Sequence, residues 1–176
     1  MGWIVMDHRP PGESHAEFFI RELLSERQTM LASAHVGGIG GTFYAAVRQR
    51  GGGEVWAMVV LTTGRPGASF GWKAMEEQMG PVESECPAHI LDLLTPTEHE
   101  YALAWRRRCR ERAERLAAVV PGAQVEFGAE FLTPDGPYKR FEAVDPSKGL
   151  FRAPTGEVYR LLRWRRGSFA VLGGAA

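Results

Sequence analysis

Acidic side chains are concentrated in a short stretch of the chain between Phe70 and Leu94. The acids are Glu76, Glu77, Glu83, Glu85 and Asp92. Carboxylates at close spacing could bind a divalent metal or supply an acid–base pair. A hard-cation site needs several oxygens that converge on one point, and if residues 72–79 are helical, neighbouring acids point about 100° apart. Solvated charge is therefore the favoured interpretation, and no metal-binding or catalytic residue is assigned.

Thiol and imidazole chemistry could arise from Cys86 and His89, which have the spacing of half a zinc site. A structural zinc site normally needs a second pair, and His99 with Cys109 is the completion that the chain offers. Cys109 falls on a predicted apolar helical stripe, where a buried, unreactive thiol is favoured. A thiol-dependent enzyme is the other alternative, because Cys86 precedes Pro87 at a predicted helix start, which favours a thiolate. No cofactor is expected.

The glycine-rich run "VGGIGG" (36–41) could hold a phosphate group. A dinucleotide-binding loop needs its glycines to open a helix, and a P-loop needs Gly-Lys-Ser or Gly-Lys-Thr. Here the glycines lead into "TFYAAV", which has the composition of a strand. We therefore expect a hairpin turn at this position and not a phosphate site.

Two arginine-rich stretches could contact phosphate groups, "WRRRCRERAER" (105–115) and "RLLRWRR" (160–166). In the first, Glu111 follows Arg107 by four residues, and such pairs are equally typical of a solvent-exposed helix face. In the second, an aromatic residue among arginines on a small β domain could bind single strands by stacking and charge. The alternative for the second stretch is a strand with Leu161 or Trp164 inward and its arginines outward. Nucleic-acid contact stays open through both segments.

The composition sets wider limits on the protein. A chain of 176 residues suffices for one ordinary domain, or for one domain with a small appendage. The charged fraction of 24% and the formal net charge of zero do not indicate a strongly basic nucleic-acid binder. We expect a reduced, cytoplasmic protein, because two cysteines cannot form a disulfide framework and the N-terminus lacks a signal-peptide pattern. No apolar run approaches the roughly 18 residues of a membrane span, so no membrane partner is expected.

The first two thirds of the chain predict an antiparallel meander sheet. Strands are expected at "GWIVMD", at residues 30–36, and at "TFYAAVRQ" and "EVWAMVVLTT". The turns between the last three are short and rich in glycine, whereas parallel pairing would need long crossovers. The sequence therefore predicts an antiparallel arrangement.

Three helices are expected to pack against this sheet. The first covers about 14–27, begins with a capping box of Ser14 and Glu17, and has an apolar stripe at helical spacing. The others cover about 87–94 and 97–119. The inward face of the last helix is predicted to contain Tyr101, Trp105, Cys109, Ala113 and Leu116.

The character of the sequence changes from Ala123 onward. Short alternating runs are separated by Pro-Asp-Gly, Pro-Ser-Lys-Gly and Pro-Thr-Gly turns. This spacing predicts a small β-barrel-like or rolled sheet of about five strands. The predicted fold class is therefore α+β, with an α+β domain over 1–120 and a small all-β domain over 121–176.

Several stretches also resemble a known family: "MGW", "TFYAAV", "FGWKAMEEQMGP", "CPAHILDLLTPTEHEYALAWRRRCRE" and "FRAPTGEVYRLLRW". Together they are similar to an uncharacterised bacterial domain-of-unknown-function family found on phages, plasmids and integrative elements. The resemblance covers most of the chain and is densest from Phe70 to Arg110. Family members often have an acidic residue where this chain has Ala74 and another polar residue where it has His89. These departures weaken the acid–base and zinc interpretations.

The mobile-element setting of that family implies a small accessory protein that binds a macromolecule of the host or of the element. Inhibition of host defence, of the anti-CRISPR or anti-restriction kind, is one such role. We therefore expect a non-catalytic binding protein, with a protein partner favoured over nucleic acid. The alternatives are a small metal- or thiol-dependent enzyme acting on nucleic acid or nucleotide, and a nucleic-acid-binding accessory protein.

Candidate partner-binding residues are chosen by type, because aromatic and arginine side chains are the usual anchors of interfaces. They lie in the loop before the acidic stretch, in the long helix and in the C-terminal arginine-rich segment. The candidates are Arg65, Phe70, Trp72, Lys73, Arg106, Arg107, Arg110, Arg163, Trp164, Arg165 and Arg166.

Overall fold

The computed structural model describes residues 3–6, 10–37, 41–63, 70–162 and 164–172 of the chain. The chain divides into two units, Met1–Glu111 and Arg112–Ala176. Each unit contains one five-stranded antiparallel sheet, and helices are few, so the protein is richer in sheet than the α+β prediction implied. The division between the units falls inside a helix, whereas the predicted boundary lies near Pro121. Among the described residues, no helix has both the length and the apolar character needed to cross a membrane.

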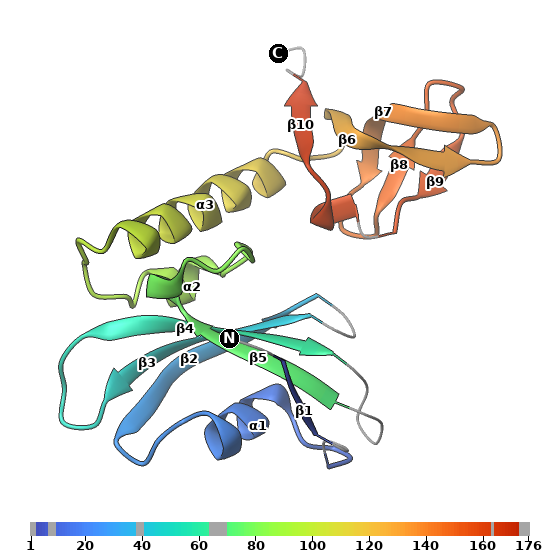
Figure 1. Cartoon of the computed structure of the whole chain (residues 1–176). Coiled ribbons are helices and arrows are strands. Elements are labelled where there is room, and N and C mark those ends of the chain that lie inside the picture. The colour runs from blue at the N-terminus through green and yellow to red at the C-terminus, as the bar shows by residue number, and fades with distance from the viewer. Residues whose placement is uncertain (1–2, 7–9, 38–40, 64–69, 163, 173–176) are drawn as a thin grey trace. The chain divides into compact units, whose positions relative to one another are not determined.

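The sheet of the first unit has the strand order β1-β5-β4-β3-β2 (Figure 1). Strands β2 to β5 follow one another as an antiparallel meander, and β1 pairs with the other side of β5. The predicted meander is confirmed, and the glycine-rich run joins the paired strands β2 and β3; residues 38–40 lie outside the described part. The elements of this unit are β1 (Ile4–Met6), α1 (His15–Glu22), β2 (Gln28–Val36), β3 (Thr42–Gln49), β4 (Val55–Thr63), β5 (Phe70–Glu76), the 3-10 helix η1 (Glu77–Met79), α2 (Ala88–Leu91) and the first part of α3 (Glu100–Ala117).

Both faces of this sheet are covered. Successive side chains of a strand point to opposite faces. One face packs against α1 through a cluster that includes Phe43 and Phe70. The opposite face packs against α2 and α3 through a cluster that includes Tyr44 and Trp105. Figure 1 shows α1 and α2 on opposite sides of the sheet. Burial on both faces explains why β3 and β4 are apolar along most of their length, with no alternation.

Helix α1 begins at the predicted capping box. The backbone N of Ser14 donates to Glu17 Oε2 at 2.7 Å, and the backbone N of Glu17 donates to Ser14 Oγ at 3.2 Å. The helix ends at Glu22, earlier than predicted. Phe18 and Phe19 set its buried direction, and Ile20, the next residue along the helix, is 50% exposed.

Two local expectations are corrected. The stretch from Trp72 to Met79 is not a helix, because residues up to Glu76 pair with β4 and form the strand β5. In α3 the predicted inward residues Trp105 and Cys109 are buried, whereas Tyr101 and Ala113 are exposed. The residues of α3 that are buried are Ala102, Trp105, Arg106 and Cys109.

The second unit contains a sheet with the order β10-β6-β7-β8-β9. About five strands were predicted here, and this number is confirmed. The pairings leave β9 and β10 as the two edges, so within the described residues no barrel closes. The elements are β6 (Gln124–Thr133), β7 (Gly136–Asp145), β8 (Leu150–Arg152), β9 (Val158–Arg160), the 3-10 helix η2 (Trp164–Arg166) and β10 (Phe169–Leu172).

Aromatic side chains fill the inner side of this second sheet. The Phe127 ring meets the Phe141 and Phe151 rings edge-on, with centroids 5.9 and 5.7 Å away. The Trp164 ring lies 5.1 Å from Phe151 and 5.6 Å from Phe169, so it links β8 to β10. Trp164 thus faces inward as one alternative predicted, although it belongs to the short helix η2 and not to a strand.

The cap of α1 gives a test of the first unit. Replacing Ser14 by Ala removes the acceptor for the Glu17 N–H, and we expect a loss of about 1 kcal/mol in the free energy of unfolding of this unit. Urea denaturation followed by far-ultraviolet circular dichroism measures it. Ser25→Ala is the control, because Ser25 is exposed and its own bonds involve only backbone atoms. Equal effects of the two substitutions would contradict the role of the cap.

Candidate functional site

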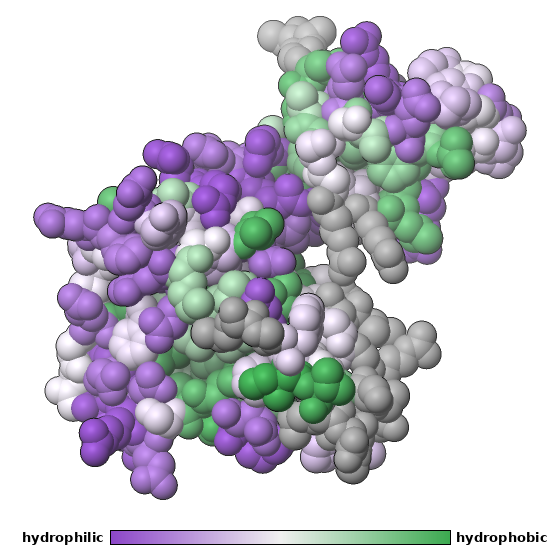
Figure 2. Space-filling model, in the orientation of Figure 1, coloured by the Kyte–Doolittle hydropathy of each residue, from purple (hydrophilic) through white to green (hydrophobic). Residues whose placement is uncertain are grey.

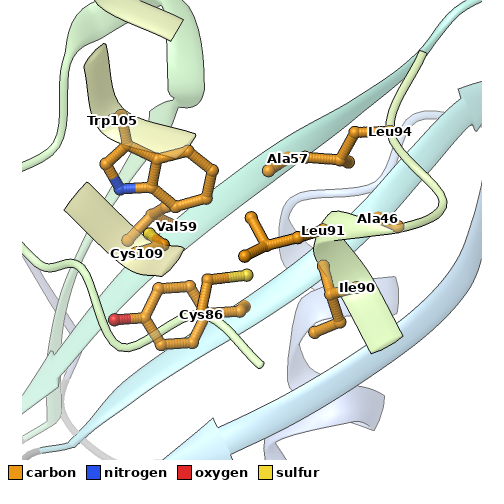
Figure 3. Close-up of a cluster of buried hydrophobic side chains, with 10 residues drawn as sticks. Ala46, Ala57, Val59, Cys86, Ile90, Leu91, Leu94, Trp105 and Cys109 are labelled. Carbon is orange, nitrogen blue, oxygen red and sulfur yellow. The ribbon is translucent and has the colours of Figure 1, made fainter. Parts of the chain in front are cut away.

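The side chains with chemical potential in the first unit lie between the sheet and α3. Cys86, Trp105 and Cys109 are buried there, and Figure 3 shows them in one cluster with Leu91 and Val59. The segment that carries Cys86 follows β5 and packs against α3. The side chains of α3 therefore determine the surroundings of the acidic residues and of Cys86.

The main polar feature of this region is a buried ion pair between Glu77 and Arg106. The side chain of Glu77 is 2% exposed and that of Arg106 is 8% exposed. Arg106 Nε donates to Glu77 Oε2 at 2.6 Å, and Nη2 donates to Oε1 at 2.7 Å. The backbone N of Ala57 donates to the same Oε1 at 3.2 Å, and Arg106 Nη1 donates to the carbonyl of Thr95 at 2.7 Å. Burial of both charges is offset because each polar atom of the pair has a partner.

The segment after η1 is fastened to α3 by further bonds. Trp105 Nε1 donates to the carbonyl of Glu83 at 2.7 Å, and Arg108 Nη2 donates to the carbonyl of Pro81 at 2.7 Å. Gly80 has a φ of 64°, and a Cβ added there would lie 3.5 Å from the Cβ of Tyr101. The turn at Gly80 is therefore suited to glycine by its backbone angle, and it brings the segment against the first turn of α3.

The two thiols are buried and held in their neutral form. Burial raises the pKa of Cys86 strongly, and it raises the pKa of Cys109 to about 11. Cys86 Sγ lies 3.9 Å from the carbonyl of Pro87, to which it can donate. The predicted thiolate at this helix start is not favoured by these surroundings, because α2 has only four residues and the sulfur atom is surrounded by apolar side chains.

The acidic and zinc hypotheses find no common site. Glu76 and His89 are exposed, whereas Cys86 is buried, so their side chains have different surroundings. The backbone of Glu85 is bound, since its N donates to Tyr44 Oη at 3.1 Å. Within the part of the chain that the structure describes, no three His, Cys, Asp or Glu side chains form a group that could hold a metal ion.

The candidates on α3 fall into two classes. Arg106 is buried and paired, so it is unavailable to a partner. Arg107 and Arg110 are exposed, and Arg107 Nε lies 3.8 Å from Glu111 Oε1, as the predicted i,i+4 pairing implies. Leu103 is 49% exposed on the same side of the helix. We call Leu103, Arg107 and Arg110 the α3 outer surface; the surface over α3 that is seen in Figure 2 is mostly hydrophilic.

The aromatic candidates before α3 lie in the core. Phe70 and Trp72 point toward α1, where their rings meet the Phe18 ring edge-on at 5.0 and 5.9 Å between centroids. They support the sheet and are not exposed anchors. Lys73 is half-buried on the opposite face of β5, and Arg65 lies outside the described residues.

The C-terminal candidates are divided in the same way. Trp164 is buried in the core of the second unit, and the guanidinium carbon of the exposed Arg165 lies 5.3 Å from its ring centroid. The carbonyl of Arg165 accepts a hydrogen bond from Arg112. The ring therefore has no free face on which a base would stack as proposed for this segment. Arg163 and the side chain of Arg166 lie outside the described part of the structure.

Residues 96–164 match the model of a domain of unknown function, DUF6927. The DUF6927 match begins just before α3 and ends at Trp164, so it covers parts of both units. This match supports an uncharacterised domain family. No curated protein and no solved structure gives a significant match to the chain.

The buried ion pair predicts a large effect of a small change. Glu77→Gln leaves Arg106 charged and buried without a counter-charge, so we expect the free energy of unfolding to fall by about 3 kcal/mol or more. Glu77→Leu combined with Arg106→Leu should cost less than the sum of the two single changes. Guanidinium denaturation of wild type, both single variants and the double variant gives the coupling energy. Additive losses would contradict a direct pair.

The thiols predict a pH and reagent dependence. In the native protein at pH 8 we expect both cysteines to react slowly with a disulfide reagent such as dithionitrobenzoate, and to react fully in denaturant. Because the folded-state pKa of Cys109 lies above its ordinary value of 9.0, its contribution to stability is present below pH 9 and is lost as the pH rises toward about 11. Single Cys86→Ala and Cys109→Ala variants assign the two reactions. Rapid reaction of either native thiol would contradict this assignment.

Proposed function

We propose that this chain is a non-catalytic binding protein, of the accessory kind encoded by phages and other mobile elements, that acts in the cytoplasm on a macromolecule of the host or the element. Inhibition of a host defence system is the role that this proposal favours. The resemblance described above supplies the setting. The main support for a binding function is the exposure of the α3 outer surface.

This surface is presented by a helix whose opposite side is fixed. Trp105 and Cys109 are fully buried against the sheet, and Arg106 is locked to Glu77. Leu103 and Arg107 therefore project from a helix that need not order itself when a partner binds. Preorganisation of this kind lowers the entropic cost of association. Arginine is also one of the residue types enriched at the hot spots of interfaces.

The charges around this surface favour a protein partner over nucleic acid. Glu111 lies against Arg107, and Glu100 and Glu114 are exposed on the same helix. Carboxylates next to arginines repel phosphates, whereas a protein surface can complement charges of both signs. Support for the nucleic-acid alternative comes from the arginines of the second unit; Arg165, for example, is exposed.

The thiol-dependent enzyme is the weaker alternative, because Cys86 and Cys109 are both buried with raised pKa values. A metal-dependent reaction would need acids that converge on one point, and Glu77 is already committed to Arg106 and Ala57. These observations support binding as the role of the chain.

The test is an affinity capture from host lysate with and without nuclease. We expect a partner that wild-type protein captures in both conditions and that a Leu103→Asp, Arg107→Glu variant loses by at least about tenfold, since both central anchors change. Val158→Asp is the matched control, because Val158 is an exposed apolar residue on β9.

Salt separates the two partner classes in the same experiment. Capture of a protein through this surface should change little between low and moderate salt, whereas nucleic-acid binding falls steeply. Capture that depends on nuclease-sensitive material, or that is equal for the double variant and wild type, would contradict the proposal.

A further inference from the structure

Basic side chains of the second unit gather around the loop between β7 and β8. Arg160, the last residue of β9, donates from Nε to the carbonyl of Lys148 in this loop at 3.2 Å. The backbone N of Leu161 donates to the carbonyl of Gly149 at 2.9 Å. The end of β9 is therefore fastened to the loop, and the positive charges of Lys148 and Arg160 lie near each other.

The short helix η2 adds a third basic side chain to this place. A Cβ added at Gly149 would lie 3.5 Å from Cδ1 of Trp164, so η2 packs against the same loop. The guanidinium carbon of Arg165 lies 5.3 Å from the centroid of the Trp164 ring. Arg112 of α3 donates to the carbonyl of Arg165 and brings a further positive charge. We call Lys148, Arg160 and Arg165 the basic patch.

The basic patch is exposed and only partly neutralised. All three of its side chains are exposed. Within the described residues, neither Arg160 nor Arg165 forms an ion pair with a carboxylate. Lys148 Nζ lies 2.8 Å from Asp145 Oδ2, so three positive charges face one negative charge. The α3 outer surface differs in this respect, because there the carboxylates outnumber the arginines.

We propose that the basic patch binds the phosphate backbone of a single-stranded nucleic acid. A guanidinium presents a planar fork of donors that matches the oxygens of a phosphate group, and two of the three basic residues are arginines. These residues come from a loop, a strand end and a short helix, so they can contact successive phosphates of a polymer. Such contacts depend on charge and do not select a base sequence.

An exposed apolar residue beside the patch favours a single strand over a duplex. Leu162 directly follows the bonded Leu161, and its side chain is 74% exposed. The bases of a single strand are accessible to such a side chain, whereas those of a duplex are stacked inside the helix. Trp164 takes no part in this contact, because its ring is buried in the core of the unit.

This inference goes beyond the proposed function, because it concerns a different surface and a different class of partner. The Leu103→Asp, Arg107→Glu variant changes the α3 outer surface and leaves the basic patch as it is. A partner of the α3 outer surface is therefore one that this variant loses, and nucleic acid bound by the basic patch is retained by it. The two proposals can consequently fail separately.

Titration of a fluorescently labelled single-stranded oligonucleotide of about 15 nucleotides with the full chain tests the proposal by anisotropy. Three phosphate contacts predict that the logarithm of the binding constant falls with the logarithm of salt concentration with a slope of about −2. In a Lys148→Gln, Arg160→Gln variant we expect the dissociation constant at low salt to rise at least about tenfold. The slope should weaken by about 1.4, since two contacts are lost.

The matched control is Lys139→Gln with Arg140→Gln, which removes the same charge from exposed residues of β7. We expect this variant, and the α3 outer-surface variant, to bind the oligonucleotide like wild type. Unchanged thermal melting shows that each variant is folded.

Four outcomes overturn the proposal. They are absence of binding by wild type at low salt, an equal loss in the control and patch variants, tighter binding of a duplex than of the single strand, and equally effective competition by polyglutamate of the same total charge. The last outcome would assign the patch to an acidic protein instead.

Discussion

The buried pair of Glu77 and Arg106 is the constraint on which the first unit depends. A carboxylate and a guanidinium removed from water are tolerated only when both are fully bonded. Here two hydrogen bonds within the pair and one each from Ala57 and Thr95 meet this requirement. The pair joins the end of β5, the strand β4, the segment at Thr95 and the helix α3. Because the bonds are bidentate and short, they fix the rotation of α3 about its axis. That rotation determines which side chains of α3 are buried and which face solvent.

The rest of the region follows from this fixed rotation. Trp105 reaches the carbonyl of Glu83, and Cys109 enters the apolar cluster with Cys86. Glu77 and the Cys86 thiol thereby have structural roles, and the exposed arginines of α3 lie on its outer side. A stretch with the composition of a reaction centre is thus mainly the attachment of a helix to a sheet. In the function that we propose, a partner is recognised by side chains that do not participate in this attachment.

The fold could be predicted from the sequence further than the site. The meander, the capping box at Ser14 and the strand-rich C-terminal part were accessible because they depend on local turns and alternation. The pairing of Glu77 was not, since it depends on a residue 29 positions away. One signal was present: Arg106 lies on the same side of the helix as Ala102 and Cys109. A buried arginine there requires an acidic partner. The predicted inward residues Trp105 and Cys109 are buried, but the prediction included the exposed Tyr101 and left out Arg106, so this requirement was missed.

Residue type alone was also a poor guide to exposed anchors. Phe70, Trp72 and Trp164 were selected as aromatic residues, but each completes a core. Large aromatic rings bury the most apolar area, so in a small unit they are placed in the core and are not exposed to a partner.

The division of the chain inside α3 has a practical consequence for experiments on the DUF6927 segment. A recombinant fragment cut at residues 96 and 164 would lack β10, the neighbour of β6, and also the sheet that buries Trp105. Its helix would expose an indole and an unpaired buried-type guanidinium to water. The boundaries of sequence similarity are therefore not the boundaries of an autonomous folding entity, and truncation at them would report misfolding as loss of activity.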